Sequence, residues 1–230
     1  MHVFISDAHI RTDNSERCRM LLRFLDEMRP HLTDLYILGD LFEIWFEYSL
    51  VFPKDYFQPL AAFHNILNDG KKIHYVLGNH EITIGNFLSN FGFIVHRGPT
   101  VFDIDGRRVL LAHGNTIDKR LWTSFWENLL TSRLNHMLFR LLHPDLGISL
   151  AQSIARFSRR QPPSKRLMGM LENYAMRRLN DVDIVILAHS HSPVFKKILP
   201  NKYYINAGDW VTHFSYVTID GDRISLKYFK

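Results

Sequence analysis

Tyr-Val-Leu-Gly-Asn-His-Glu, at residues 75–81, joins an apolar run to a glycine that is followed by an amide, an imidazole and a carboxylate. An apolar run without alternation is typical of a strand that is covered on both faces. A turn after this strand has a use for the glycine and for Asn79, but it has none for His80 and Glu81. We therefore expect the end of this strand to carry chemistry.

Four further apolar runs stop in the same way, at a side chain that can bind a metal ion. They lead to Asp7 and His9, to Asp40, to His113, and to His189 and His191. In open parallel sheets, ligands gather outside the carboxyl ends of the strands. The five strand ends therefore predict that seven side chains meet in one place, namely Asp7, His9, Asp40, Asn79, His113, His189 and His191. Other histidines, among them His74 and His96, have no motif around them, so we expect structural roles for them.

The predicted ligands combine carboxylates, imidazoles and one amide, a mixture that suits manganese, iron or zinc rather than calcium. Cysteine is missing from the set, which disfavours a structural zinc site. Seven ligands are too many for one ion, but they suit two ions about 3.5–4 Å apart, an arrangement that clamps a phosphoryl group and activates water. We expect two divalent ions, with manganese first among the candidates and iron, zinc or a mixed pair as alternatives. Asp40 is the expected bridging ligand, and His80 remains free to donate a proton or a hydrogen bond to the reacting group.

The first 112 or so residues read as alternating strands and helices. Strands are expected at 2–6, 34–38 and 73–77, with helices near 15–28 and 55–68. This alternation predicts a parallel sheet with right-handed crossovers. Two Asp-Gly pairs, at 105–106 and 220–221, predict the turns of two later hairpins.

Residues 118–180 break this alternation with a long, basic stretch of helical character, which we expect to form an insertion over the strand ends. Between residues 119 and 178 it holds eleven Lys and Arg residues against three Asp and Glu, whereas the remainder of the chain has a net charge of −3. Such a segment favours an anionic partner, although a solvated helical surface would explain the charge as well. The candidate substrate contacts in this stretch are Arg156, Arg159, Arg160, Lys165 and Trp122.

The chain of 230 residues is long enough for one domain, 1–230, with an elaborate insertion, and its 46% of hydrophobic residues can build a core. No apolar run reaches the roughly 18 residues of a membrane span, and the first residues lack the features of a signal peptide. Cys18, the single cysteine, favours a reducing compartment. We expect a cytoplasmic protein. The basic, aromatic segment leaves peripheral contact with the inner membrane face open, and the oligomeric state is open too.

Five short motifs, in their order along the chain, resemble the calcineurin-type metallophosphoesterase family. They are Asp-Ala-His at 7–9, Gly-Asp at 39–40, Gly-Asn-His-Glu at 78–81, His-Gly at 113–114 and His-Ser-His at 189–191. The resemblance implies a four-layered α/β-β/α sandwich with a helical insertion and two metal ions. It assigns Asp7, His9, Asp40 and His191 to one ion, and Asp40, Asn79, His113 and His189 to the other.

A narrower resemblance is to the branch of this family that hydrolyses UDP-2,3-diacylglucosamine in lipid A synthesis. It rests on Tyr-Ile-Leu-Gly-Asp-Leu-Phe-Glu-Ile-Trp at 36–45, on the insertion after His-Gly at 113–114, and on Asn-Ala-Gly-Asp-Trp at 206–210. The branch cleaves a pyrophosphate to release UMP and lipid X, which implies an anionic, nucleotide-linked lipid as substrate. Many members carry Arg where this chain has His80, and the usual sequence has Asp where this chain has Asn115.

Two other functions stay open at this stage. A phosphoesterase for another phosphodiester, nucleotide or phosphomonoester would fit the departures at His80 and Asn115. A non-catalytic scaffold of the same fold would be expected to lose ligands or the proton donor, and this chain keeps all of them. Nucleic acid is a disfavoured partner, because no basic stripe interleaved with stacking aromatics lies outside the insertion.

Overall fold

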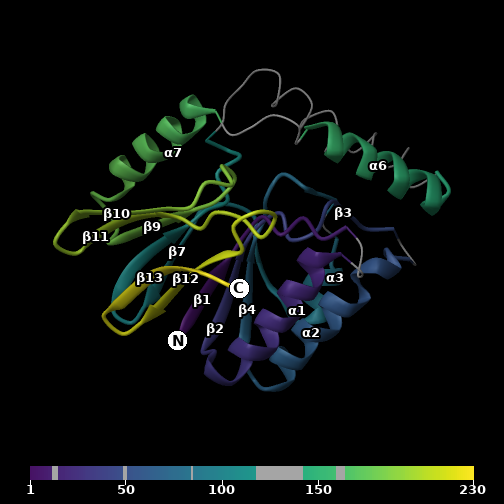
Figure 1. Cartoon of the computed structure of the whole chain (residues 1–230), viewed down its shortest axis with the longest axis horizontal. Helices are drawn as coiled ribbons and strands as arrows, with labels where there is room; N and C mark the ends of the chain where they lie inside the picture. Colours follow the sequence, from purple (N-terminus) through teal and green to yellow (C-terminus); the bar gives the residue numbers. More distant parts are fainter. Residues whose placement is uncertain (12–14, 49–50, 84, 118–141, 159–163) are drawn as a thin grey trace.

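The computed structural model describes residues 1–11, 15–48, 51–83, 85–117, 142–158 and 164–230. Its strands form two large sheets that pack face to face, and helices cover the outer face of each sheet (Figure 1). The layers therefore follow the order α/β-β/α, which confirms the predicted four-layered sandwich.

The first sheet has six strands. Across the sheet they are β13 (Arg223–Tyr228), β12 (Ser215–Asp220), β1 (His2–Ile5), β2 (Asp34–Leu38), β4 (Lys72–Val76) and β6 (Ile94–His96). β1, β2, β4 and β6 run parallel, with Leu35 of β2 opposite Val3 of β1 and Ile73 of β4. The predicted alternation of strands and helices is confirmed here, and the carboxyl ends of these strands lie at one edge.

The second sheet has five strands. Across the sheet they are β10 (Val194–Leu199), β11 (Lys202–Asn206), β9 (Ile184–Leu187), β8 (Arg107–Leu111) and β7 (Thr100–Ile104). The three central strands are parallel, with Val185 of β9 opposite Leu110 of β8 and Tyr204 of β11. The two outer strands are antiparallel to their neighbours. β8 and β9 therefore also deliver their carboxyl ends to a common edge.

Helices α1 (Glu16–Met28) and α2 (Phe57–Asn68) cover the first sheet, and α7 (Lys165–Arg178) covers the second (Figure 1). α1 and α7 each begin after a serine whose hydroxyl oxygen accepts a hydrogen bond from a backbone N–H of the first turn. Ser15 accepts from Cys18 at 3.2 Å, and Ser164 accepts from Leu167 at 3.1 Å. Such caps satisfy amide groups that the helix itself leaves unpaired.

Three apolar clusters hold the layers together. The first packs α1 and α2 on the first sheet and contains Phe24 and Phe63. The second lies between the sheets and contains Phe4 and Ile186. The third packs α7 on the second sheet through Leu171. Truncation of a buried phenylalanine to alanine destabilises a protein by about 3–5 kcal/mol, so these clusters support the edge on which the strand ends meet.

Both hairpins predicted from the Asp-Gly pairs are present, and one of the two turns lies at the predicted residues. Asp105 and Gly106, with φ of 50° and 73°, join β7 to β8 as a two-residue turn. β12 and β13 are joined by Gly221 and Asp222, one residue later than predicted, because Asp220 still pairs with the opposite strand.

The described parts of residues 118–180 include two helices, α6 (Pro144–Ser158) and α7. Since Leu167, Leu171 and Ala175 are buried against the second sheet, α7 forms an outer layer of the sandwich itself. α6 exposes Leu146 and Leu150, at 66% and 48% of their surface. Residues 118–141 and 159–163 lie outside the described residues, so the limits of the insertion stay a prediction.

Shorter elements complete the described chain. They are η1 (Arg29–His31), β3 (Trp45–Phe46), η2 (Lys54–Tyr56), β5 (Glu81–Thr83) and α3 (Phe87–Phe91). β3 pairs in parallel with β5, which draws the segment after β2 beside the segment after β4. Among the described helices, none has the length and apolar character that crossing a bilayer would demand.

Candidate metal centre

The carboxyl ends of five strands, three from the first sheet and two from the second, meet at one edge of the sandwich. Asp7 and His9 follow β1, Asp40 follows β2, Asn79 and His80 follow β4, His113 follows β8, and His189 and His191 follow β9. Their side chains form three groups in which potential ligand atoms lie within 4.8 Å of one another. The groups are Asp7, His9 and His191; His9, Asp40 and His80; and Asp40, His113 and His189. Segments up to 184 residues apart in the chain thus share one site.

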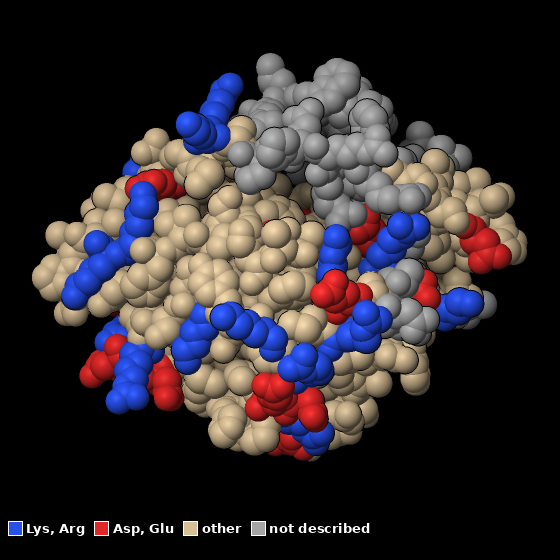
Figure 2. All heavy atoms as spheres, viewed as in Figure 1, with Lys and Arg blue, Asp and Glu red and all other residues tan. Residues whose placement is uncertain are grey.

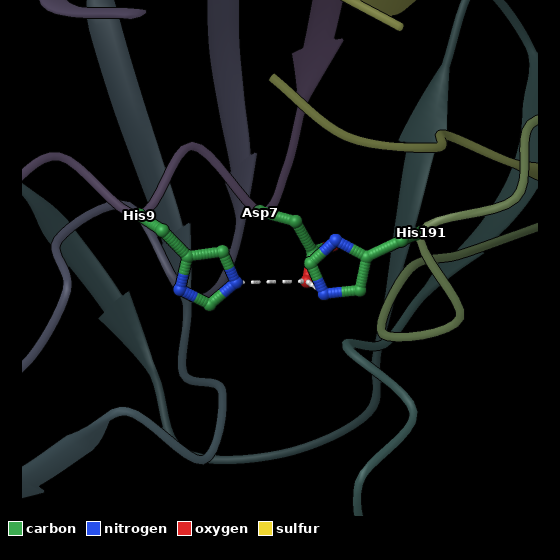
Figure 3. A group of neighbouring side chains, drawn as sticks. All are labelled: Asp7, His9 and His191. Atoms are coloured by element: carbon green, nitrogen blue, oxygen red, sulfur yellow. Dashed lines mark ion pairs between the residues drawn. The ribbon is translucent and has the colours of Figure 1, made fainter. Parts of the chain in front are cut away.

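Asp7, His9 and His191 form the first group, with both imidazoles turned toward the carboxylate (Figure 3). Asp7 Oδ1 lies 3.8 Å from His9 Nε2 and 3.4 Å from His191 Nε2. Asp7 Oδ1 and His9 Nε2 are buried and have no hydrogen-bond partner among the described residues. Buried polar atoms without partners are rare. A cation between these atoms would satisfy them, so the group fits a metal ion.

The group on the other side of Asp40 consists of Asp40, His113 and His189, and Asn79 joins it. His113 Nε2 lies 3.4 Å from Asp40 Oδ2, 3.1 Å from Asn79 Oδ1 and 3.2 Å from His189 Nδ1. His113 Nδ1 lies 2.7 Å from the carbonyl oxygen of Leu38, so the Nδ1–H donates there and Nε2 faces the group. Four atoms that carry lone pairs therefore converge, and they require a cation among them, either a proton or a metal ion.

The protonation of the imidazoles follows from this crowding. Burial opposes the charged form of His113, yet Asp40 and Asp7 raise the pKa of its imidazole to about 10. Burial and the neighbouring His113 lower the pKa of His189 to about 3, and burial lowers the pKa of His9 to about 4. Neutral imidazoles are the form that binds metal. The proton held by His113 neutralises the carboxylates in the way that a metal cation would.

Asp40 lies between the two groups. Its Oδ2 is 3.4 Å from His113 Nε2 and 3.8 Å from His9 Nε2, while its Oδ1 accepts a hydrogen bond from the His80 backbone N–H at 3.0 Å. Burial would raise the pKa of the Asp40 carboxyl, but His113 and His80 hold it well below the usual range. A charged carboxylate in contact with both groups has the position that a bridging ligand requires.

Five of the seven predicted ligands adopt the left-handed backbone conformation. They are Asp7, His9, Asp40, His189 and His191, with φ between 45° and 68°. This conformation costs a non-glycine residue about 1–2 kcal/mol, so the neighbouring loops must impose it. Asp7 N–H donates to the Gly39 carbonyl at 3.2 Å, and His9 N–H donates to the Asp40 carbonyl at 2.9 Å. Backbone strain of this kind clusters at functional sites.

Two glycines allow the loops after β2 and β4 to approach each other. A Cβ on Gly39 would lie 2.7 Å from Gly78 and from His113 Nδ1, and a Cβ on Gly78 would collide with the Asp40 carboxylate. Gly39 also has a φ of 78°. The glycine before each ligand is therefore needed for close packing as well as for the turn.

Glu81 lies behind the ligand loops, and sequence reasoning assigned no role to it. Its buried Oε2 accepts hydrogen bonds from the backbone N–H groups of Gly78, at 2.6 Å, and Asp40, at 3.2 Å. Its Oε1 accepts a hydrogen bond from the Tyr75 hydroxyl at 2.7 Å. Burial and Asp40 raise the pKa of Glu81 to about 7. Glu81 ties the Asp40 loop to the Asn79 loop, and its place beside His80 in the quoted motif was the available signal.

His80 lies beside the cluster with 7% of its surface exposed. Its Nδ1 is 2.6 Å from the carbonyl oxygen of Glu43, so the Nδ1–H donates away from the cluster. Its Nε2 lies 3.8 Å from Asp40 Oδ2, and its ring meets the ring of His9 edge-on at 4.6 Å between centroids. When His80 is protonated, its Nε2–H faces the cluster.

Asp209, in the turn after β11, is the second residue that sequence reasoning missed. Its Oδ2 lies 3.4 Å from His191 Nδ1. Burial would raise the pKa of this carboxyl, but His191 and the backbone N–H groups of His213 and Thr212 hold it below the usual range. The signal was the stretch at 206–210, which the resemblance used without assigning a role to its aspartate.

The predicted substrate contacts lie apart from these strand-end loops in the sequence. Lys165 is exposed at the start of α7, and Arg156 belongs to α6. Trp122, Arg159 and Arg160 lie outside the described residues. Figure 2 shows Lys and Arg spread over the described face with Asp and Glu among them, so the described surface has no single basic patch in this view. The substrate contacts stay predictions.

Sequence comparisons with known proteins find relatives of this chain. Proteins named UDP-2,3-diacylglucosamine hydrolase are similar to the chain over almost its full length. One from Porphyromonas gingivalis is 27% identical and covers 97% of this chain and 95% of its own. One from Pseudomonas putida is 28% identical and covers 100% of this chain and 99% of its own.

Among solved structures, vacuolar protein sorting 29 from Cryptosporidium parvum aligns with a TM-score of 0.48 at 15% identity, over 99% of this chain and 96% of its own. This likeness is too distant to carry an argument. The profile of the family described as calcineurin-like phosphoesterase matches residues 3–193. Because this match covers most of the chain and all five strand ends, the chain belongs to the calcineurin-like phosphoesterase family.

Proposed function

We propose that the protein hydrolyses the pyrophosphate bond of UDP-2,3-diacylglucosamine to UMP and lipid X, with two divalent metal ions at the strand ends. The observation that carries the proposal is the convergence of carboxylates, imidazoles and an amide around Asp40. The names of the full-length relatives supply the substrate class. Family membership supplies the reaction class, hydrolysis of a phosphate ester.

The proposed ligands fall into two sets that share Asp40. Asp7, His9, Asp40 and His191 would hold one ion, and Asp40, Asn79, His113 and His189 would hold the other. Manganese is the proposed metal, since oxygen and imidazole donors without thiolates suit it, and iron and zinc suit the same donors. When bound, the two ions supply charge for the phosphate oxygens and a water of lowered pKa.

The chain's own residues contribute orientation and a proton. His80 is proposed as the general acid, because its Nδ1–H is committed to the Glu43 carbonyl and its Nε2 faces the cluster. Protonated at Nε2, it can give its proton to the oxygen that leaves phosphorus. Glu81 keeps the backbone amides of Gly78 and Asp40 at a fixed separation, which keeps the neighbouring Asn79 in reach of His113.

The basic, helical stretch at 118–180, whose last helix α7 also packs on the second sheet, is proposed to hold the rest of the substrate. Arg156, Arg159, Arg160 and Lys165 would contact phosphate or nucleotide, and Trp122 would contact the nucleotide or the acyl chains. Peripheral contact with a membrane would follow if the acylated substrate is drawn from a bilayer. Replacing Lys165 by glutamate tests this part. A KM raised several-fold with kcat unchanged supports it, and an unchanged KM indicates a solvated surface charge.

The decisive experiment is a substrate panel with manganese present. It compares UDP-2,3-diacylglucosamine, UDP-sugars without acyl chains, bis(p-nitrophenyl) phosphate and cyclic nucleotides. Release of the nucleoside monophosphate or of p-nitrophenolate measures each rate. Selective cleavage of the acylated nucleotide is the expected result. Equal rates for UDP-sugars with and without acyl chains would contradict the lipid part of the proposal.

A second candidate is a phosphoesterase for another phosphodiester, nucleotide or phosphomonoester. His80 and Asn115 favour it, because they depart from the residues expected of the lipid-specific branch. Turnover of only the small esters in the same panel would establish this candidate in place of the first.

A further inference from the structure

The turn after β11 ties the two sheets together and carries a buried carboxylate, Asp209, which is 2% exposed. Ala207 N–H donates to the carbonyl of Leu187 at the end of β9, at 2.8 Å. Trp210 N–H donates to the carbonyl of Asp7 in the loop after β1, at 3.1 Å. Asp209 is therefore held in place relative to both loops that lead to the first ligand group.

The orientation of the Asp209 carboxylate is fixed by its own backbone. Oδ1 accepts hydrogen bonds from the N–H groups of Val211, Thr212 and His213, at 3.0, 2.7 and 2.9 Å. Three donors occupy this oxygen, which leaves Oδ2 for side chains. Oδ2 lies 3.4 Å from His191 Nδ1 and 3.3 Å from His213 Nδ1.

This contact determines which nitrogen of His191 is available. A carboxylate beside Nδ1 favours the tautomer with the proton there, and Nε2 then presents a lone pair toward Asp7 Oδ1, 3.4 Å away. In His113 and His80 the equivalent Nδ1–H faces a backbone carbonyl. Among the site histidines that the structure describes, His191 alone has its Nδ1 against a carboxylate. A carboxylate behind a histidine ligand orients the ring and makes it a stronger donor.

We propose that Asp209 is a positioning residue of the metal centre, which fixes the tautomer and ring orientation of His191 and strengthens its Nε2 as a ligand. The inference rests on the proposed function, since it requires His191 to bind a metal ion. It also predicts that the binding of the two ions depends on different residues. The ion on the side of Asp7 depends on Asp209, whereas the ion between His113 and His189 does not.

Asp209→Asn separates this role from a structural one. The amide oxygen of the asparagine still accepts the three backbone N–H groups, so the NH₂ group faces His191. A donor at that point pairs with an unprotonated Nδ1, which places the proton on Nε2 and removes the metal-binding lone pair. The variant should therefore keep its fold and bind one of the two ions more weakly.

The measurement is titration of the metal-free, full-length protein with Mn²⁺ by isothermal calorimetry, together with the melting temperature of the same samples. Wild type should show two sites, and Asp209→Asn should lower the affinity of one of them about 10–100-fold at an unchanged melting temperature. His213→Ala is the matched control, because it removes the other imidazole on the same oxygen. It should leave both affinities unchanged. Asp209→Ala should weaken the same site and also melt earlier, since three backbone N–H groups lose their acceptor.

Wild-type affinity at both sites of Asp209→Asn would overturn this inference and leave the proposed function standing. Equal weakening of both sites with a lower melting temperature would also overturn it, since that result indicates a structural role. A wild type that binds no Mn²⁺, or a single ion, would contradict the proposed function itself and the inference with it.

Discussion

Buried or partly buried histidines occur in two regions of this protein, and the two regions use them differently. At the strand ends, His9, His113 and His189 sit in or beside strained loops and face carboxylates. In the strands of the first sheet, His74 and His96 lie on regular backbone and face aromatic rings. The same side chain thus serves as a candidate ligand in one region and as a packing unit in the other.

His74 belongs to a ladder of rings that crosses the first sheet. Its ring stacks on Tyr36 at 4.7 Å between centroids, and Tyr36 stacks on Phe4 at 4.7 Å. His74 Nδ1 lies 3.2 Å from His96 Nε2, and the ring of Phe102 meets both histidines edge-on. The environment of an imidazole, more than its burial, therefore decides between chemistry and packing.

The largest expected effect follows from Asp40→Ala. Asp40 contacts both ligand groups, so its loss should disassemble the centre. We expect kcat/KM to fall at least about 10,000-fold, because only substrate binding would then still contribute to the rate. Activity with each substrate of the panel and metal content measure the effect. A variant that keeps both ions and substantial turnover would refute the bridging role.

His80→Ala should have the next largest effect. Loss of a general acid lowers turnover about 100- to 10,000-fold, and the metal content should stay at the wild-type level, because His80 is proposed to act on substrate. The measurement is kcat for two esters that differ in leaving-group pKa. A good leaving group should soften the loss, and an equal loss for both esters would argue against proton donation. His64→Ala, at an exposed histidine, is the matched control and should leave kcat unchanged.

Glu81→Ala tests whether a residue behind the ligands matters as much as the ligands do. Two buried backbone N–H groups lose their acceptor, which costs about 1–3 kcal/mol of stability. The loops after β2 and β4 should separate, and kcat/KM should fall about 10–100-fold. Tyr75→Phe removes one hydrogen bond of Glu81 and keeps the two from the backbone, so its effect should be clearly smaller. Equal effects of the two variants would locate the function of Glu81 in its contact with Tyr75.

The sequence was sufficient to predict the parallel strands and the set of side chains at the strand ends, because apolar runs that stop at polar residues are local features. The four-layered sandwich was expected only from the resemblance to the family. The sequence was not sufficient to predict the roles of Glu81 and Asp209. Their roles depend on which backbone amides and imidazoles lie near them in the folded chain, and no spacing encodes that. The turn after β12 was misplaced by one residue for the same reason, since the pairing of Asp220 with Arg223 is settled by the register of the strands.

The smallest expected effect concerns the aromatic ladder, where His74→Phe should leave activity unchanged and alter only the response of stability to pH. Burial and His96 lower the pKa of His74 to about 4, below the 6.5 of an unfolded histidine. As the pH falls from 6.5 to 4, the unfolded chain takes up the proton first, so the folded state loses stability over this window. The His74 side chain is partly exposed, and after allowance for this the free energy of unfolding falls by about 1–2 kcal/mol.

His74→Phe should remove this part of the acid sensitivity, which urea unfolding at pH 7 and pH 5 of metal-free protein would measure. His31→Phe, the same change at an exposed histidine, should keep the wild-type slope between these two pH values. If His74→Phe instead abolished turnover, the distinction between histidines inside strands and histidines at strand ends would fail. If both variants kept the full acid sensitivity, the sensitivity would have to come from other groups such as His9 and His189, whose pKa values burial also lowers.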